Sequence, residues 1–133
     1  MGYYVTFEES TAKFKIKNKK KIIDALKSKN KEVPEYDRLS PVLDSNNIKE
    51  IFAELEFEIE KSGKYYKIVS YIGEKLGDQE VWLPIIAPYM EDGFIHMTGE
   101  DGNHWKWKFS NGRFREVGSR TMFDDEFHVK IDE

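Results

Sequence analysis

The clearest pattern of apolar positions in the chain predicts a helix. Four apolar side chains recur at positions i, i+3, i+4 and i+7: Ile48, Ile51, Phe52 and Leu55. This spacing places them on one face of an α-helix. Three polar residues just before the helix can cap its first turn: Ser45, Asn46 and Asn47. Glu50 follows Asn47 by three residues, as in a capping box.

A second helix is predicted over about residues 19–29. Ile22, Ile23 and Leu26 form a narrow apolar stripe there, and Asn18 is placed to cap the first turn. Residues 30–44 contain prolines and polar residues, so they are predicted to form the longest irregular connection.

Alternation of apolar and polar residues predicts two strands near the N-terminus. In residues 3–8 the alternating apolar positions are Tyr3, Val5 and Phe7, and in residues 12–17 they are Ala12, Phe14 and Ile16. Lysines fill the other face of the second strand. The turn-like residues 9–11 separate the two strands, which are therefore predicted to pair as a hairpin.

A second hairpin is predicted after the helix at residues 48–55. Residues 56–60 alternate glutamate with apolar side chains, residues 61–64 suit a turn, and residues 65–72 form the returning strand. The hairpin therefore has one acidic face. A loop with two glycines follows over residues 73–78.

The segment from Gln79 to Met90 has helical spacing but contains Pro84 and Pro88. A proline inside a helix removes a backbone hydrogen bond and costs about 3 kcal/mol. The sequence therefore predicts a short helix that begins near Pro84, where proline is tolerated in the first turn.

Three strands are predicted at the C-terminal end, over residues 94–98, 104–109 and 113–117. Asn111-Gly112 predicts a type I′ hairpin turn, and Glu100-Asp101-Gly102 suits a three-residue loop that closes on glycine. The two turns predict registers that agree with each other. Both place the same apolar side chains on one face, which must be core: Ile95, Met97, Trp105, Trp107, Phe109 and Phe114.

The opposite face of these strands is predicted to carry ionisable side chains: His96, His104, Lys106, Lys108, Arg113 and Arg115. Lys108 is expected directly across from Arg115, and a like-charge pair of this kind is normally destabilising. Two explanations remain open. Either acids of the same chain cover the pair, with residues 124–126 as the candidates, or an acidic partner protein binds there.

These elements predict an α+β fold with one domain over residues 1–133. Its sheet is mainly antiparallel and ends in a three-stranded meander, with two to three helices packed on one face. The apolar stripe of residues 48–55 is expected to pack on the aromatic face of the meander. Residues 118–126 are predicted to be a flexible link, and residues 127–133 either an extra strand or a disordered tail.

Composition excludes several classes of protein. The chain has no cysteine, which rules out disulfides, thiolate metal sites and a cysteine nucleophile. The N-terminus lacks the pattern of a signal peptide, and no apolar run approaches the length of a membrane span. The sequence therefore predicts a cytoplasmic protein that does not contact a membrane.

Charge is distributed unevenly along the chain. Residues 13–31 contain nine lysines and one acid, a local charge of +8 in a protein of net charge −4. This segment supports an alternative function, the binding of nucleic acid by Lys13, Lys15, Lys17, Lys19, Lys20 and Lys21. The position of most aromatic residues on core-facing sites counts against it, because stacking on bases needs exposed rings.

No catalytic residues, metal ligands or cofactor are predicted. The chain lacks a Gly-x-Ser-x-Gly elbow, a Walker loop and a dinucleotide-binding glycine motif. His96 and His104 can approach each other across their hairpin, but they have no clear third ligand for a metal. The acids of residues 99–102 are expected to serve the turn.

Several motifs resemble a loose group of small uncharacterised phage and bacterial proteins. They are Met1-Gly2-Tyr3-Tyr4, the segment from Tyr71 to Glu80, Ile86-Ala87-Pro88-Tyr89, and Gly99-Glu100-Asp101-Gly102 followed by Trp105, Trp107, Phe109 and Gly112. The group has no established activity, so the resemblance implies no site residues. It suggests an accessory protein of a phage or mobile element, a class that often binds a host or rival protein. Together with the missing catalytic motifs and the basic side chains of the meander, it gives the expected function: a non-enzymatic, inhibitor- or immunity-like protein that binds an acidic protein. The expected binding residues are His104, Lys106, Lys108, Arg113 and Arg115.

Overall fold

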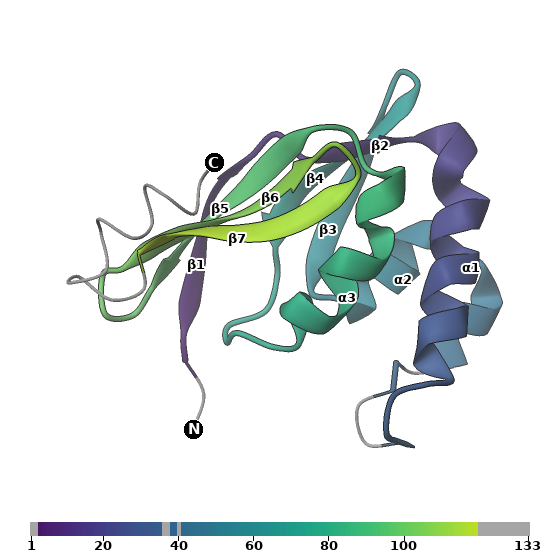
Figure 1. The fold of residues 1–133 in the computed structure, drawn as a ribbon, viewed down its shortest axis with the longest axis horizontal. Coiled ribbons are helices and arrows are strands. Elements are labelled where there is room, and N and C mark those ends of the chain that lie inside the picture. Colours follow the sequence, from purple (N-terminus) through teal and green to yellow (C-terminus); the bar gives the residue numbers. More distant parts are fainter. Residues whose placement is uncertain (1–2, 36–37, 40, 120–133) are drawn as a thin grey trace.

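The computed structural model of the chain describes residues 3–35, 38–39 and 41–119. They form one α+β domain, as predicted (Figure 1). The strands form two antiparallel sheets, whereas the sequence predicted a single one. In chain order the strands, α-helices and 3₁₀ helices (η) are β1 (Val5–Ser10), β2 (Lys13–Lys15), η1 (Ile16–Asn18), α1 (Lys19–Asn30), η3 (Pro41–Ser45), α2 (Ile48–Glu54), β3 (Phe57–Ser62), β4 (Tyr65–Tyr71), α3 (Gln79–Ile86), η4 (Ala87–Tyr89), β5 (Gly93–Gly99), β6 (His104–Ser110) and β7 (Arg113–Ser119).

The larger sheet has the strand order β1-β5-β6-β7 and contains the predicted meander. Both predicted registers are confirmed, since Met97 pairs with Trp105 and Phe109 pairs with Phe114. Asn111 and Gly112 both have positive φ, at 53° and 76°, as a type I′ turn requires. The predicted link at residues 118–126 and the tail at 127–133 lie outside the described residues, apart from Gly118 and Ser119, with which β7 ends.

The smaller sheet has the order β2-β4-β3. Its β3–β4 hairpin is confirmed, with Ser62 opposite Tyr65 and Gly63 in the turn at a φ of 61°.

The prediction of an N-terminal hairpin is wrong. β1 pairs with β5 and β2 pairs with β4, so the two strands belong to different sheets. Residues 11 and 12 form a corner between them: the amide of Thr11 donates to the carbonyl of Phe94 at 2.8 Å, and the carbonyl of Ala12 accepts from the amide of Ile68 at 3.0 Å. Alternation of side chains identifies a strand but carries no information about its partner, which is why the pattern misled here.

The two predicted N-terminal helices are confirmed as α1 and α2. The side chain of Asn47 caps α2 by accepting hydrogen bonds from the amides of Lys49 and Glu50. Asn18 precedes α1 but does not cap it, because its side-chain amide points instead to the carbonyl of Tyr89, 3.4 Å away.

The third helix begins five residues earlier than predicted. α3 starts at Gln79 and contains Pro84 in its interior, then continues into η4. Its inward side chains, Trp82, Leu83 and Ile86, are almost fully buried. Burial of each such side chain stabilises the fold by about 1.5–3 kcal/mol, which together exceeds the cost of about 3 kcal/mol for one interior proline.

The helices gather at one end of the molecule, and the larger sheet extends away from them (Figure 1). The sequence predicted that α2 packs on the aromatic face of the meander. In the structure Phe52 of α2 stacks instead on Phe14 of β2, with ring centroids 5.3 Å apart. The helix that contacts the meander is α3, which lies against β7. Trp107 joins the two sheets, because its ring contacts Phe57 at 6.0 Å and Tyr71 at 6.2 Å.

Candidate functional site

The predicted binding residues all lie on the outward face of β6 and β7. His104, Lys106 and Lys108 project from β6, and Arg113 and Arg115 from β7; together they are called the basic face. Lys108 is half-buried and the other four side chains are exposed. The alternate residues of β6 point the other way, and Trp105, Trp107 and Phe109 are each 1% exposed. The strand alternation therefore separates the basic face from the core completely.

Lys108 and Arg115 are register partners, as predicted. The acids proposed from sequence to cover this pair, Asp124, Asp125 and Glu126, lie outside the described residues.

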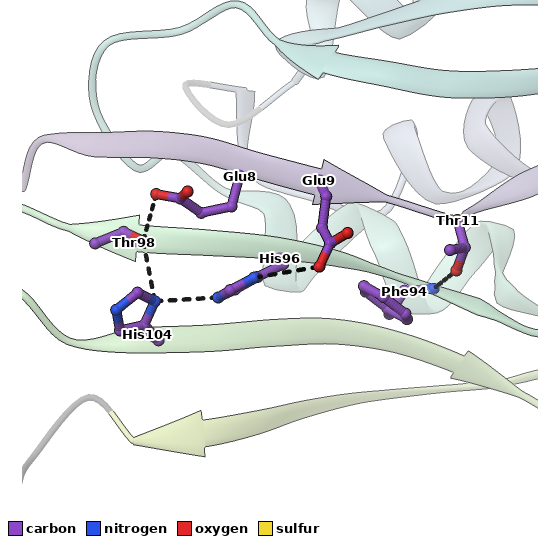
Figure 2. A network of polar contacts seen from close by, with 7 residues as sticks. All are labelled: Glu8, Glu9, Thr11, Phe94, His96, Thr98 and His104. Carbon is purple, nitrogen blue, oxygen red and sulfur yellow. Dashed lines mark hydrogen bonds and ion pairs between the residues drawn. The ribbon is translucent and has the colours of Figure 1, made fainter.

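An acidic strip borders the basic face along β1. A bulge between Phe7 and Glu9 in the pairing of β1 with β5 brings both Glu8 and Glu9 to the outward side, where a regular strand would show only one of them. Figure 2 shows the two carboxylates beside His96, Thr98 and His104. No local pattern in the sequence indicates this arrangement, because the partner of β1 lies about ninety residues further along the chain.

A chain of polar contacts joins this strip to His104. Glu8 accepts a hydrogen bond from the hydroxyl of Thr98 at 2.7 Å, and Nδ1 of His104 lies 3.1 Å from the same hydroxyl oxygen. Nδ1 of His104 is also 3.1 Å from Nε2 of His96, whose Nδ1 lies 3.9 Å from Glu9 (Figure 2).

These contacts assign the tautomers of both histidines. Because Thr98 donates its only proton to Glu8, it can only accept from His104, which must carry its proton on Nδ1. The same N–H also faces Nε2 of His96, which therefore accepts, and the proton of His96 lies on Nδ1 toward Glu9.

The two histidines do meet across the hairpin, as the sequence suggested they could. Within the described ranges, however, no group of three or more histidine, aspartate or glutamate side chains is arranged to hold a metal ion. The contact between the rings is accounted for by their mutual hydrogen bond.

Phe94 adds an aromatic surface beside the basic face. The ammonium of Lys106 lies 4.2 Å from the centre of the Phe94 ring, within the range of a cation–π interaction. Phe94 was not predicted as a site residue from the sequence. Its position was nevertheless predictable, because it directly precedes the core residue Ile95 and neighbouring residues of a strand point to opposite faces.

The acids of the Gly99–Gly102 loop bind the N-terminal segment. Asp101 accepts a hydrogen bond from the hydroxyl of Tyr3, and Glu100 accepts one from the backbone amide of Tyr4 at 2.7 Å. The hydrogen bond from Tyr3 is the largest of the contacts that hold the pKa of Asp101 below its ordinary value, followed by those from Asn103. The predicted turn role is thus only part of their function in the fold.

The lysines of residues 13–21 do not form one surface. Lys13 and Lys15 project from β2 on the side opposite the buried Phe14, and Lys17 is exposed in η1. Lys19, Lys20 and Lys21 continue onto α1, where Lys20 forms an ion pair of 3.0 Å with Asp24.

Comparisons with models of known protein families, with curated protein sequences and with solved structures found no match to this chain. No helix in the described part of the chain is long and apolar enough to cross a membrane.

Proposed function

We propose that this protein is a non-enzymatic binding protein that recognises an acidic surface of another protein through its basic face. The observation that carries the proposal is the concentration of basic side chains, four of the five exposed, on the outward face of β6 and β7, in a chain whose net charge is −4. Charged surfaces of this kind attract complementary surfaces and set the orientation of the complex.

The acidic strip supports this reading and defines the partner further. Glu8 and Glu9 border the face on the β1 side, so the exposed surface changes sign from β1 to β7. A partner with acidic groups placed over Lys106 and Arg113 and with neutral or basic groups over the strip would fit this pattern. A uniformly acidic surface would meet like charge at β1, and the strip therefore contributes to specificity.

The resemblance of several motifs to small phage and bacterial proteins supports a role as an accessory protein of a phage or other mobile element. In this proposal it acts in the cytoplasm, as an inhibitor of a host or rival protein or as an immunity-like factor.

Capture of a partner from a nuclease-treated lysate of the host cells tests the proposal. The wild-type protein should retain an acidic protein, and Lys106→Glu/Arg113→Glu should retain about 10-fold less of it. The control Lys31→Glu/Lys49→Glu makes the same change in net charge at two exposed positions, one just after α1 and one in α2, and should behave as wild type. Equal capture by the wild type and the Lys106→Glu/Arg113→Glu variant would remove the basic face as the binding site.

A further inference from the structure

A second basic surface lies on the smaller sheet, away from the basic face. Register partners place Lys13 opposite Lys67 and Lys15 opposite Tyr65, all on the side of the sheet that faces away from the buried Phe14. β2 is an edge strand, so this surface continues to the rim of the sheet. It combines residues from the lysine-rich segment with residues about fifty positions further along the chain.

A cleft opens at this rim. It has a volume of about 500 Å³ and is lined by Lys15, Ile16, Lys17, Lys64 and Tyr65. The backbone amide of Ile16 donates to the carbonyl of Lys64 at 2.8 Å, which joins the backbones of the two walls of the cleft. This volume lies within the range of small-ligand sites, about 300–1,000 Å³. We call this feature the lysine cleft.

The lysines of this surface lack carboxylate partners in the described part of the chain. The ion pairs between described side chains join Lys20 with Asp24, Lys29 with Glu32, and His96 with Glu9. Lys13 instead places its ammonium 4.4 Å from the centre of the Tyr65 ring. Lys13 directly opposite Lys67 is a destabilising like-charge pair, although Glu60 borders Lys67 on its other side. A bound anion would relieve that repulsion.

An aromatic ring in a basic cleft is the combination that single-stranded nucleic acids require. Lysines neutralise the phosphates, and an accessible aromatic ring stacks on an unpaired base. Tyr65 is half-buried at the wall of the cleft, and lysines lie on both sides of it along the sheet. An acidic peptide would use the lysines but has no need of the ring.

We propose that the lysine cleft binds single-stranded nucleic acid, with Lys15, Lys17 and Lys64 on the phosphates and Tyr65 stacked on a base. Lys13 and Lys67 extend the phosphate-binding surface along β2 and β4. This site is separate from the basic face, and it narrows the nucleic-acid alternative raised by the lysine-rich segment. Lys19, Lys20 and Lys21 are not part of it.

Fluorescence anisotropy with labelled oligo(dT) and oligo(U) of about 15 nucleotides tests the site. Affinity should fall as salt rises from about 50 to 200 mM, with a slope of log K against log salt of about −0.7 per phosphate contacted. Lys15→Glu/Lys64→Glu should weaken binding and reduce the magnitude of the slope by about 1.4. The charge-matched control Lys31→Glu/Lys49→Glu should retain the wild-type slope.

Tyr65 separates stacking from simple charge attraction. Tyr65→Leu should weaken binding by about 5- to 100-fold without changing the salt slope, and Tyr65→Phe should bind as wild type. A duplex of the same length should bind more weakly than either single strand. An absence of binding at low salt would overturn the proposal. So would an equal loss of affinity in Lys15→Glu/Lys64→Glu and in its control. Equal affinity for duplex and single strand, together with no effect of Tyr65→Leu, would overturn it as well. Circular dichroism of each variant shows that it is folded.

Discussion

Gly99 is the residue at which the N-terminal segment meets the C-terminal meander. A Cβ atom built at this position would overlap the hydroxyl of Tyr3, which lies directly over the glycine and donates to Asp101. Tyr3 and Tyr4 of the first motif are therefore in direct contact with residues 99–102 of the second. The sequence shows both motifs but not the contact, because nothing local to either one specifies the other.

Gly99→Ala should destabilise the protein by about 1–3 kcal/mol, because the added methyl group must displace Tyr3. Urea denaturation measures the change. The matched comparison is the same substitution in a Tyr3→Ala background, where the ring is gone and the cost should fall below about 0.5 kcal/mol. An equal loss of stability in the two backgrounds would mean that contact with Tyr3 is not the reason why position 99 requires glycine.

Tyr71 shows how burial changes the chemistry of one side chain. It is 6% exposed, and its hydroxyl donates to the carbonyl of Lys75 at 2.6 Å. Burial, and after it the charge of Glu56, raise the pKa of Tyr71 from 10.0 to about 12. The neutral phenol is thus favoured in the folded state.

Because the pKa of Tyr71 is higher in the folded than in the unfolded protein, its neutral phenol contributes its full stabilisation below pH 10. This contribution is lost as the pH rises from 10 toward 12. Between about pH 9 and 11 the wild type should lose about 1 kcal/mol more of its free energy of unfolding than Tyr71→Phe, which has no phenol to ionise. Urea denaturation of both proteins at the two pH values measures this difference. Parallel losses in the two proteins would show that Tyr71 is not the group responsible.

At the scale of single elements, α3 is the one in which packing overrides local preference. Pro84 lies inside the helix, where its missing amide leaves the carbonyl of Glu80 without the usual bond. The proline itself is exposed, while Trp82, Leu83 and Ile86 on the other side are buried. The start of this helix is not predictable from the prolines alone, because the deciding energy comes from contacts with the rest of the core.

Pro84→Ala should stabilise the protein by about 1 kcal/mol, since it restores a backbone hydrogen bond and a helix-favouring residue; the gain is reduced by the greater freedom of the unfolded chain. Pro88→Ala is the matched control. Pro88 stands at the start of η4, where proline is tolerated, so its replacement should give no gain. Denaturation midpoints of the two variants give the comparison, and a destabilised Pro84→Ala protein would contradict this account of α3.

At the scale of the whole molecule, the corner at residues 11 and 12 determines the architecture. It sends β1 into one sheet and β2 into the other, and thereby places the acidic strip beside the basic face. The meander was predictable because its two turns, Asn111-Gly112 and Glu100-Asp101-Gly102, each specify a register between neighbouring strands. The pairings of β1 and β2 were not, because they join distant segments without any turn between them.

The same contrast holds for the sites. His104, Lys106, Lys108, Arg113 and Arg115 follow directly from the alternation of the meander strands, and all five lie on one face. Glu8 and Glu9 reach that face only through a bulge and a distant pairing. Lys64 and Tyr65 likewise join Lys15 only through the pairing of β2 with β4, which the sequence pattern did not indicate.

A lysine footprint of the complex tests the basic face as the binding surface. The captured partner is mixed with the protein, exposed lysines are acetylated briefly, and mass spectrometry compares each site with the free protein. If the basic face binds the partner, acetylation of Lys106 should fall about 5-fold or more in the complex, while Lys49 on α2 reacts as before. Unchanged reactivity of Lys106 together with protection of lysines elsewhere would contradict the assignment of the basic face as the binding surface.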